Sequence, residues 1–412
     1  MPILARVLAL CAITSAVAGA QQNASRADST NAGSRSDTSL GTSTLRRAAK
    51  AAVAAQQQPT GPTNPRLAPD ISAVGDLVAD MSPKGSTQDG DCRFCVREVE
   101  VAIQAVVDPY FRGDFFLGIS DAEKISIEQA FLTTTSLPSN LEVRLGRYLM
   151  PVGKQNTTHR HDLHTVEYPY VIQRFLSTDG LKGTGVYVSK VFSPFGFYQE
   201  LQVTAVDRFG DPTAGVTPPE PVNKELGGMG YSARLRNYVD LSESTNIELS
   251  GSAITGKREQ PFAGAAPPAT AFNARQSVFG GDLTFRWRPL QQGLYRSFIM
   301  QAEFMRQVNQ VVALAGYAGP SRDFSGGYVF SRYQIGPRSF LGARFDHVED
   351  PTLGGATLNA GSGYLEWFPS EFSKLVAAYE RVMPASSTGN PAVNRILFQA
   401  SFALGPHKPH PF

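Results

Sequence analysis

The 412-residue chain has little of what marks most other protein classes. It contains three cysteines and two tryptophans, and no apolar run approaches the 18 residues of a membrane helix. Long helical periods are few. Its 38 Lys and Arg nearly cancel its 36 Asp and Glu, giving a net charge of +2, which argues against a nucleic-acid partner.

The N-terminus has the features of an export signal. Residues 1–6 carry a positive charge, residues 7–17 are apolar, and small residues follow. The apolar run is too short to span a membrane as a helix. We therefore expect residues 1–20 to be a signal peptide, removed on export. Residues 21–68, rich in Ser, Thr, Ala, Gln and Asn with almost no aromatics, are predicted to be a disordered periplasmic segment.

Alternation is the informative pattern in the rest of the chain. Within residues 279–287, Phe, Gly, Leu, Phe and Trp fall on one face, and Gly, Asp, Thr and Arg fall on the other. Such segments bury one face and wet the other. The pattern predicts sixteen strands, near residues 70–80, 97–107, 110–119, 125–136, 141–153, 182–193, 196–209, 226–241, 245–258, 275–289, 296–310, 321–336, 339–350, 358–370, 373–384 and 394–404.

The connections between these strands fall into two classes that alternate. The short ones lie near residues 108–109, 137–140, 193–195, 242–244, 290–295, 336–338 and 370–372. The others, most of them long, are residues 81–96, 120–124, 154–181, 210–225, 259–274, 311–320, 351–357 and 385–393. Aromatic residues cluster at the short turns, as in an interfacial girdle. We predict an all-β fold, a transmembrane antiparallel β-barrel of about 16 strands over residues 69–404, with short periplasmic turns and longer outer loops. Residues 405–412 would form a C-terminal periplasmic tail.

Alternation also assigns ionisable side chains to the inside of this barrel. Charged groups on the lipid face are costly, so their inward placement requires a wet interior. The expected pore-lining residues are Arg112, Asp114, Arg144, Arg234, Arg236, Asp282, Arg286, Glu303 and Arg344. Further carboxylates expected inside include Glu98, Glu100, Glu142, Glu200, Glu248, Asp346 and Glu380. Because these side chains include both acidic and basic groups, the strands by themselves indicate no preference for anions or cations. Many of these groups would form salt bridges along the wall.

A local resemblance adds to this prediction. Residues 145–156, LGRYLMPVGKQN, resemble the strand-and-loop entry of the phosphate-selective porin family through Gly146, Arg147, Pro151 and Gly153. The resemblance implies a porin of sixteen strands with a basic constriction. Porins of this family are usually trimers, so the resemblance also implies a homotrimer. The mixed inward charges depart from a ladder of Arg and Lys, so membership among porins is favoured and phosphate selectivity is not.

In general porins the third long loop folds into the barrel and narrows the pore. The third long connection of this chain is residues 154–181, so we expect these residues to narrow the pore. The residues expected to form the constriction are Lys154, His159, Arg160, His161, Asp162, His164, Glu167 and Arg174. Half of the six histidines lie within six residues. Imidazole is a ligand for zinc, copper or nickel, so His159, His161 and His164 form an alternative metal site, with Asp162 or Glu167 as a fourth ligand. Because no regular element aligns all three histidines, a solvated, pH-responsive constriction is the preferred interpretation.

Cys92 and Cys95 are the one cysteine pair downstream of the expected signal peptide. Outside the cytosol a disulfide between them is expected. A zinc site at this C-x-x-C would need two more ligands.

We therefore predict a porin of the bacterial outer membrane that lets small hydrophilic solutes or ions diffuse passively through a water-filled pore narrowed by residues 154–181. No cofactor and no enzymatic activity are expected, and the partners are outer-membrane lipid and the solutes. The alternative is an outer-membrane protein that takes up or binds zinc-type metals through the histidine cluster. Two further classes are an outer-membrane hydrolase, for which His347 beside Asp346 is the one strand histidine, and a filled barrel acting as adhesin or anchor.

Overall fold

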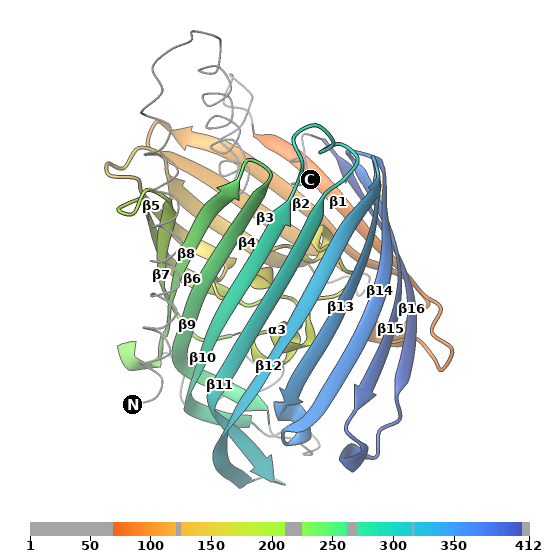
Figure 1. The fold of residues 1–412 in the computed structure, drawn as a ribbon. Coiled ribbons are helices and arrows are strands. Elements are labelled where there is room, and N and C mark those ends of the chain that lie inside the picture. Colours follow the sequence, from red (N-terminus) through yellow and green to blue (C-terminus); the bar gives the residue numbers. More distant parts are fainter. Residues whose placement is uncertain (1–68, 121–124, 211–224, 262–269, 315–316, 406–412) are drawn as a thin grey trace.

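The computed structural model describes residues 69–120, 125–210, 225–261, 270–314 and 317–405. Within them, sixteen strands form one closed antiparallel barrel, in which each strand pairs with its neighbours along the chain and the first strand pairs with the last (Figure 1). The predicted all-β, sixteen-stranded antiparallel barrel is confirmed. The predicted signal peptide (1–20), the predicted disordered segment (21–68) and nearly all of the predicted tail (405–412) lie outside the described residues and stay predictions.

The strands occupy almost the positions that alternation predicts. They are β1 (Asp70–Asp80), β2 (Phe94–Asp108), β3 (Phe111–Ile119), β4 (Ile125–Thr134), β5 (Leu141–Leu149), β6 (Lys182–Phe192), β7 (Tyr198–Val206), β8 (Gly230–Ser242), β9 (Thr245–Pro261), β10 (Thr270–Trp287), β11 (Phe298–Leu314), β12 (Tyr317–Gly336), β13 (Ser339–Asp350), β14 (Ala356–Ser370), β15 (Ser373–Pro384) and β16 (Val393–Leu404).

Two of the predicted outer loops are wrong in extent. The ladder between β9 and β10 continues to the pair Pro261 and Thr270, and that between β11 and β12 continues to Leu314 and Tyr317. Half of the predicted connection 259–274 and most of the predicted connection 311–320 are therefore strand. The extensions contain proline, alanine and glycine, which obscure the alternation of polar and apolar residues from which strands are predicted. In the structure the backbone groups of the paired strands hydrogen-bond to each other there, independently of the side chains.

The helical elements are short and lie in the connections. They are η1 (Asp89–Asp91), η2 (Gln155–Thr157), η3 (Arg160–Asp162), α3 (Tyr170–Phe175), η4 (Leu226–Gly228), η5 (Pro351–Leu353) and η6 (Ser386–Thr388). None of the helices in the described part of the chain has the length and apolar character needed to cross a membrane. Cys92 and Cys95, beside η1, form a disulfide with a Cα–Cα distance of 5.6 Å.

The barrel wall has its polar face inside and its apolar face outside. On β13, Phe345 is 53% exposed, whereas its neighbours Arg344 and Asp346 are 4% and 1% exposed. The same outward exposure recurs around the barrel at Phe115, Leu145, Val186, Leu201, Phe279, Phe304, Val329, Leu341, Leu365, Leu375 and Phe398. An exposed apolar band of this kind requires an apolar surrounding. Aromatic side chains at the turn end, including Tyr110, Phe195, Tyr295, Trp367 and Phe372, are also exposed.

A charge placed on the apolar band is expected to destabilise the barrel in lipid. Phe345→Arg should lower the free energy of unfolding by about 2–4 kcal/mol, because an arginine near the midplane meets hydrocarbon. Urea unfolding of the protein refolded into lipid vesicles measures this difference. The matched control is Leu290→Arg in the turn between β10 and β11, where the cost should be about 0–1 kcal/mol. Equal costs at the two positions would contradict the assignment of the lipid face.

Candidate functional site

The candidate site is the connection between β5 and β6, residues 150–181, which we call the lumen loop. Its helix α3 lies within the barrel (Figure 1). Apolar residues that are almost completely buried run through the loop: Met150, Val152, Leu163, Val166, Tyr168, Val171, Ile172, Phe175, Leu176 and Leu181. These loop residues belong to one buried apolar cluster together with residues of the wall such as Phe116, Met305 and Phe330.

The local sequence explains how the loop leaves and rejoins the wall. The side-chain amide of Asn156 donates to the carbonyl oxygens of Met150 (2.9 Å) and Leu181 (3.1 Å) and accepts from the backbone N–H of Leu181 (2.6 Å). Asn156 thus holds both ends of the loop together. Gly153 has a φ of 69°, and a Cβ there would lie 1.8 Å from Oε1 of Glu303 on β11, so the approach of the loop to the wall requires glycine.

Glu167 is the electrostatic centre of the lumen loop. Its carboxylate pairs with Arg160 of the loop, with Arg97 of β2 (3.6 Å) and with Arg395 of β16 (3.4 Å). Burial raises the pKa of a carboxyl group, but these guanidinium groups outweigh burial and hold the pKa of Glu167 well below its usual range. Glu167 is therefore ionised and joins two strands to the loop.

A second set of charges anchors the start of the loop. Nζ of Lys154 lies 2.8 Å from Glu248 of β9, and Glu248 also accepts from Arg236 (3.3 Å) and Arg286 (3.2 Å). Burial lowers the pKa of Lys154 to about 8, although Glu248 opposes the shift. At the far end of the loop, Arg174 pairs with Asp350 at 2.8 Å.

The residues expected to line the pore all lie on the inner face of the wall, and all have polar partners. Arg112 pairs with Asp114 (2.8 Å), Arg144 with Glu142 (2.6 Å), Arg234 with Asp282 (3.1 Å), Arg236 with Glu200 (2.7 Å), Arg286 with Glu248 (3.2 Å) and Arg344 with Asp346 (2.7 Å), while Glu303 accepts from the backbone N–H of Lys154 (3.2 Å). These pairs stiffen the wall and leave its inner surface with little unpaired charge.

Two small cavities lie beside the lumen loop. One cavity is lined by His164, Phe330 and Arg344, among others, and a second by His159, Glu128 and Lys182, among others. Each has about 10 Å³, which is room for about one water molecule. The lumen loop thus contacts the wall and is partly buried. His161 is 2% exposed, whereas the side chains of His159 and His164 are 19% and 26% exposed, and the solvated, pH-responsive constriction stays a prediction.

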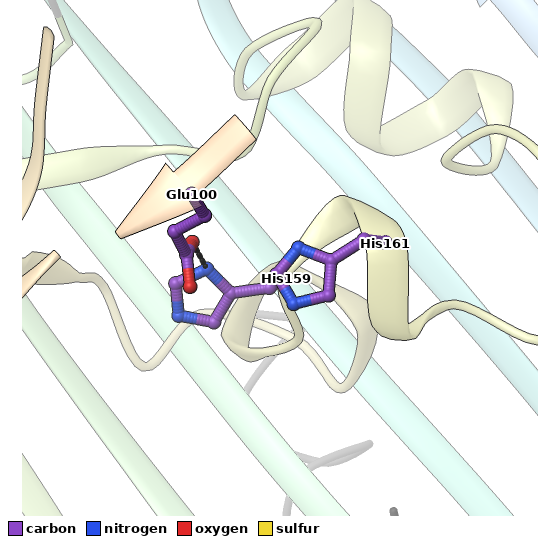
Figure 2. A group of neighbouring side chains, drawn as sticks. All are labelled: Glu100, His159 and His161. Carbon is purple, nitrogen blue, oxygen red and sulfur yellow. Dashed lines mark ion pairs between the residues drawn. The ribbon is translucent and has the colours of Figure 1, made fainter. Parts of the chain in front are cut away.

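The structure separates the three clustered histidines. His159 and His161 lie together with Glu100 of β2, and one potential ligand atom from each lies within 4.8 Å of the others (Figure 2). His164 instead places Nδ1 3.5 Å from Glu366 of β14 and stacks its ring on Phe330. Among the described residues the three histidines therefore do not form one group, and Glu100 of β2 occupies the place beside His159 and His161 that was expected for His164; metal binding by the histidines stays a prediction.

These two histidine environments are electrically different. Burial by itself lowers the pKa of His159, but the carboxylate of Glu100 outweighs burial and raises it to about 9. Burial and the nearby Arg332 lower the pKa of His164, although Glu366 opposes them. Near pH 7, His159 therefore carries a proton that His164 lacks.

Several side chains that position the loop were missed by sequence reasoning. Lys374 of β15 donates to the carbonyl oxygens of His161 (2.5 Å) and Leu163 (2.7 Å), and Arg258 of β9 donates to that of Phe175 (2.9 Å). Lys374 and Arg258 face inward by alternation, which is the signal that could have found them, but their backbone partners leave no trace in the sequence.

The strand histidine considered for a hydrolase does not face the lumen. His347 is exposed on the outer face of β13, where Nδ1 lies 2.7 Å from Oδ1 of Asn359. Asp346 faces the lumen and accepts from Arg344 and from the backbone N–H of Tyr170 (2.9 Å). Neighbours along a strand point to opposite faces, so these two side chains cannot act together.

Comparisons with known proteins agree with the barrel. No family model matches the sequence. An uncharacterized protein of Aquifex aeolicus is 25% identical over 338 residues, which cover 77% of this chain and 70% of that protein. The phosphate-selective family implied by the local resemblance is therefore not supported by these comparisons.

Solved structures of outer-membrane proteins share the fold. The outer membrane channel DcaP of Acinetobacter baumannii is 11% identical, with 84% of this chain and 100% of that chain covered and a TM-score of 0.52. The anion-selective porin of Comamonas acidovorans is 11% identical, with coverage of 81% and 98% and a TM-score of 0.51. A trimer form of OmpT, an outer membrane protein of Vibrio cholerae, is 10% identical, with coverage of 82% and 100% and a TM-score of 0.51. At these identities the likeness establishes the fold, which is that of outer-membrane porins.

Removing the charge of Glu167 is expected to loosen the lumen loop. Glu167→Gln leaves Arg160, Arg97 and Arg395 facing one another without their common carboxylate, and breaking a buried ion pair in this way costs about 3–5 kcal/mol. The free energy of unfolding should fall by this order, and limited proteolysis should cut the loop faster.

Glu371→Gln is the matched control, since Glu371 is exposed in the turn between β14 and β15. It should unfold and be cut like the wild type. If Glu167→Gln behaved like this control, Glu167 would not be the group that holds the loop.

Proposed function

We propose that the chain is a porin of the bacterial outer membrane, which lets small hydrophilic solutes or ions diffuse passively through the barrel. The observation that most directly supports this proposal is the distribution of side chains on the barrel wall. Large apolar side chains are exposed on its outer face, and charged side chains face inward. A closed sheet of this kind is stable in lipid only when its polar face surrounds water or polar protein. The porin fold of the solved structures supports the same role.

The lumen loop would set the size limit of the passage. It contacts β2, β9, β11, β13, β14, β15 and β16 through the ion pairs and hydrogen bonds described above. The cavities beside it are about the size of one water molecule. Small hydrophilic solutes or ions are the proposed cargo, and Lys154, Arg160, Asp162 and Arg174 would contribute the charges of the constriction.

The other parts of the proposal follow from the same surface. The exposed apolar band fits outer-membrane lipid. A homotrimer is supported by the trimer form of a structurally similar outer-membrane protein. The proposed activity involves no catalysis, since a channel lowers no chemical barrier.

Shortening the lumen loop is expected to raise the conductance. The backbone N–H of Met150 donates to the carbonyl oxygen of Leu181 at 2.9 Å, so residues 151–180 can be replaced by a short Gly-Ser turn that continues the β5–β6 hairpin. Planar-bilayer recordings of the refolded variant should show a severalfold larger single-channel conductance than the wild type, with the reversal potential in a salt gradient giving the ion preference.

Replacement of η6 and its flanks, residues 385–390, by the same Gly-Ser turn is the matched control and should leave the conductance unchanged. Heat-modifiable migration on gels checks that both barrels have folded. A folded, shortened barrel with no conductance would exclude a passive channel and favour an adhesin or anchor.

A further inference from the structure

A histidine pair and a carboxylate meet where the lumen loop touches the wall at β2. Glu100 and His161 are 4% and 2% exposed, and Nδ1 of His159 lies 2.7 Å from Oε2 of Glu100. The rings of His159 and His161 are near-parallel, with centroids 5.5 Å apart. Figure 2 shows the carboxylate facing the ring of His159, with the ring of His161 beside it. We infer that Glu100, His159 and His161 bind one divalent transition-metal ion of the zinc type.

The donor set fits such an ion. Two imidazoles and one carboxylate bind zinc or iron(II) with positions left open, whereas magnesium and calcium prefer sites made of oxygen. Oδ1 of Asp162 lies 3.6 Å from Nε2 of His161, which makes this carboxylate the nearest candidate for a fourth ligand. Movements of less than an ångström or so in flexible side chains would bring donors 4.8 Å apart or less to the spacing of a zinc shell, where each bond is about 2 Å long.

A neighbouring amide can hold the ring of His159 in the binding orientation. The amide of Gln129 on β4 touches Nε2 of His159 at 2.6 Å, on the side of the ring away from Glu100. In this arrangement the amide nitrogen of Gln129 faces the ring, and its oxygen accepts from the backbone N–H of Leu149 (3.2 Å). Rotation of the amide by half a turn would break that bond and let the oxygen accept the Nε2–H that a metal-bound imidazole carries when Nδ1 is the ligand. Partners of this kind orient metal-binding histidines in many proteins.

The surroundings of the cluster favour a cation. The cavity beside His159 is lined by three carboxylates, those of Glu98, Glu128 and Asp179, against the two cations Arg160 and Lys182. Glu100 adds a further negative charge next to this cavity. The carboxylates of Glu128 and Asp179 are paired with Lys182, and the cavity, with room for about one water molecule, leaves space for a water ligand.

The consequence of binding would be mechanical. Glu100 belongs to the barrel wall, whereas His159 and His161 belong to the lumen loop, so one ion would cross-link the loop to β2. Metal would thereby fix the position of the loop that narrows the bore. This inference concerns binding and does not rest on the channel proposal, since it holds for a sealed barrel as well.

Metal titration of the refolded protein in detergent tests the inference. The protein carries no histidine tag, and His407 and His410 near the C-terminus are replaced by alanine in every sample to remove competing imidazoles. We expect one Zn²⁺ per chain by equilibrium dialysis, visible absorption bands from one bound Co²⁺, and no competition from a large excess of Mg²⁺. Zn²⁺ should also slow proteolysis of the lumen loop.

His161→Ala and Glu100→Gln should each weaken Zn²⁺ binding by about tenfold to a hundredfold or more. His164→Ala is the matched control from the same loop and should bind like the parent protein. His161→Gln provides a second variant that keeps a polar side chain, should His161→Ala fail to fold. Absence of stoichiometric Zn²⁺ binding in the folded parent, or an equal loss in His164→Ala, would overturn the inference. These binding readouts are independent of conductance, so their failure is distinguishable from failure of the channel proposal.

Discussion

Closure of the hydrogen-bond ladder between β1 and β16 is the constraint on which the remaining structure depends. A sheet surrounded by hydrocarbon cannot leave an edge of unpaired N–H and C=O groups, and joining the first strand to the last removes both edges. Asp76 reinforces this seam from inside, since its carboxylate accepts from Gln399 (2.9 Å) and Ser401 (3.3 Å) of β16 and pairs with Arg97 of β2. Once the sheet is closed, alternation sends every second side chain into one shared lumen.

The charged side chains that face the shared lumen need partners of opposite charge, and the lumen loop provides some of these partners. Buried charges destabilise a protein unless each has a partner. Here the partners come from distant parts of the chain: Lys154 reaches Glu248, and Glu167 reaches Arg395. The loop also brings apolar residues such as Ile172 and Phe175, both 0% exposed, into a buried apolar cluster that wall residues such as Met305 and Phe330 complete. The loop is thus held by charge pairs at its edges and by apolar packing at its centre.

The same packing decides what the barrel can do. Sixteen strands enclose a bore that is wide in open porins, and the lumen loop with α3 lies inside this bore. In the proposed channel, passage would depend on how firmly this loop is held. Contacts such as those of Glu167, and those within the cluster of Glu100, His159 and His161, affect how firmly the loop is held.

The sequence by itself determined the barrel, because a period of two is a local property that each strand shows independently. It also located the third loop and placed Glu100, Glu248 and Arg344 on the inner face. It misjudged the ends of β9 to β12, where small residues and prolines blur the alternation. Only the tertiary structure decided the partners inside the lumen, because the loop has no repeating pattern and its path follows from contacts with many strands at once. That is why Glu100, and not His164, lies beside His159 and His161, and why Asn156 joins the two ends of the loop.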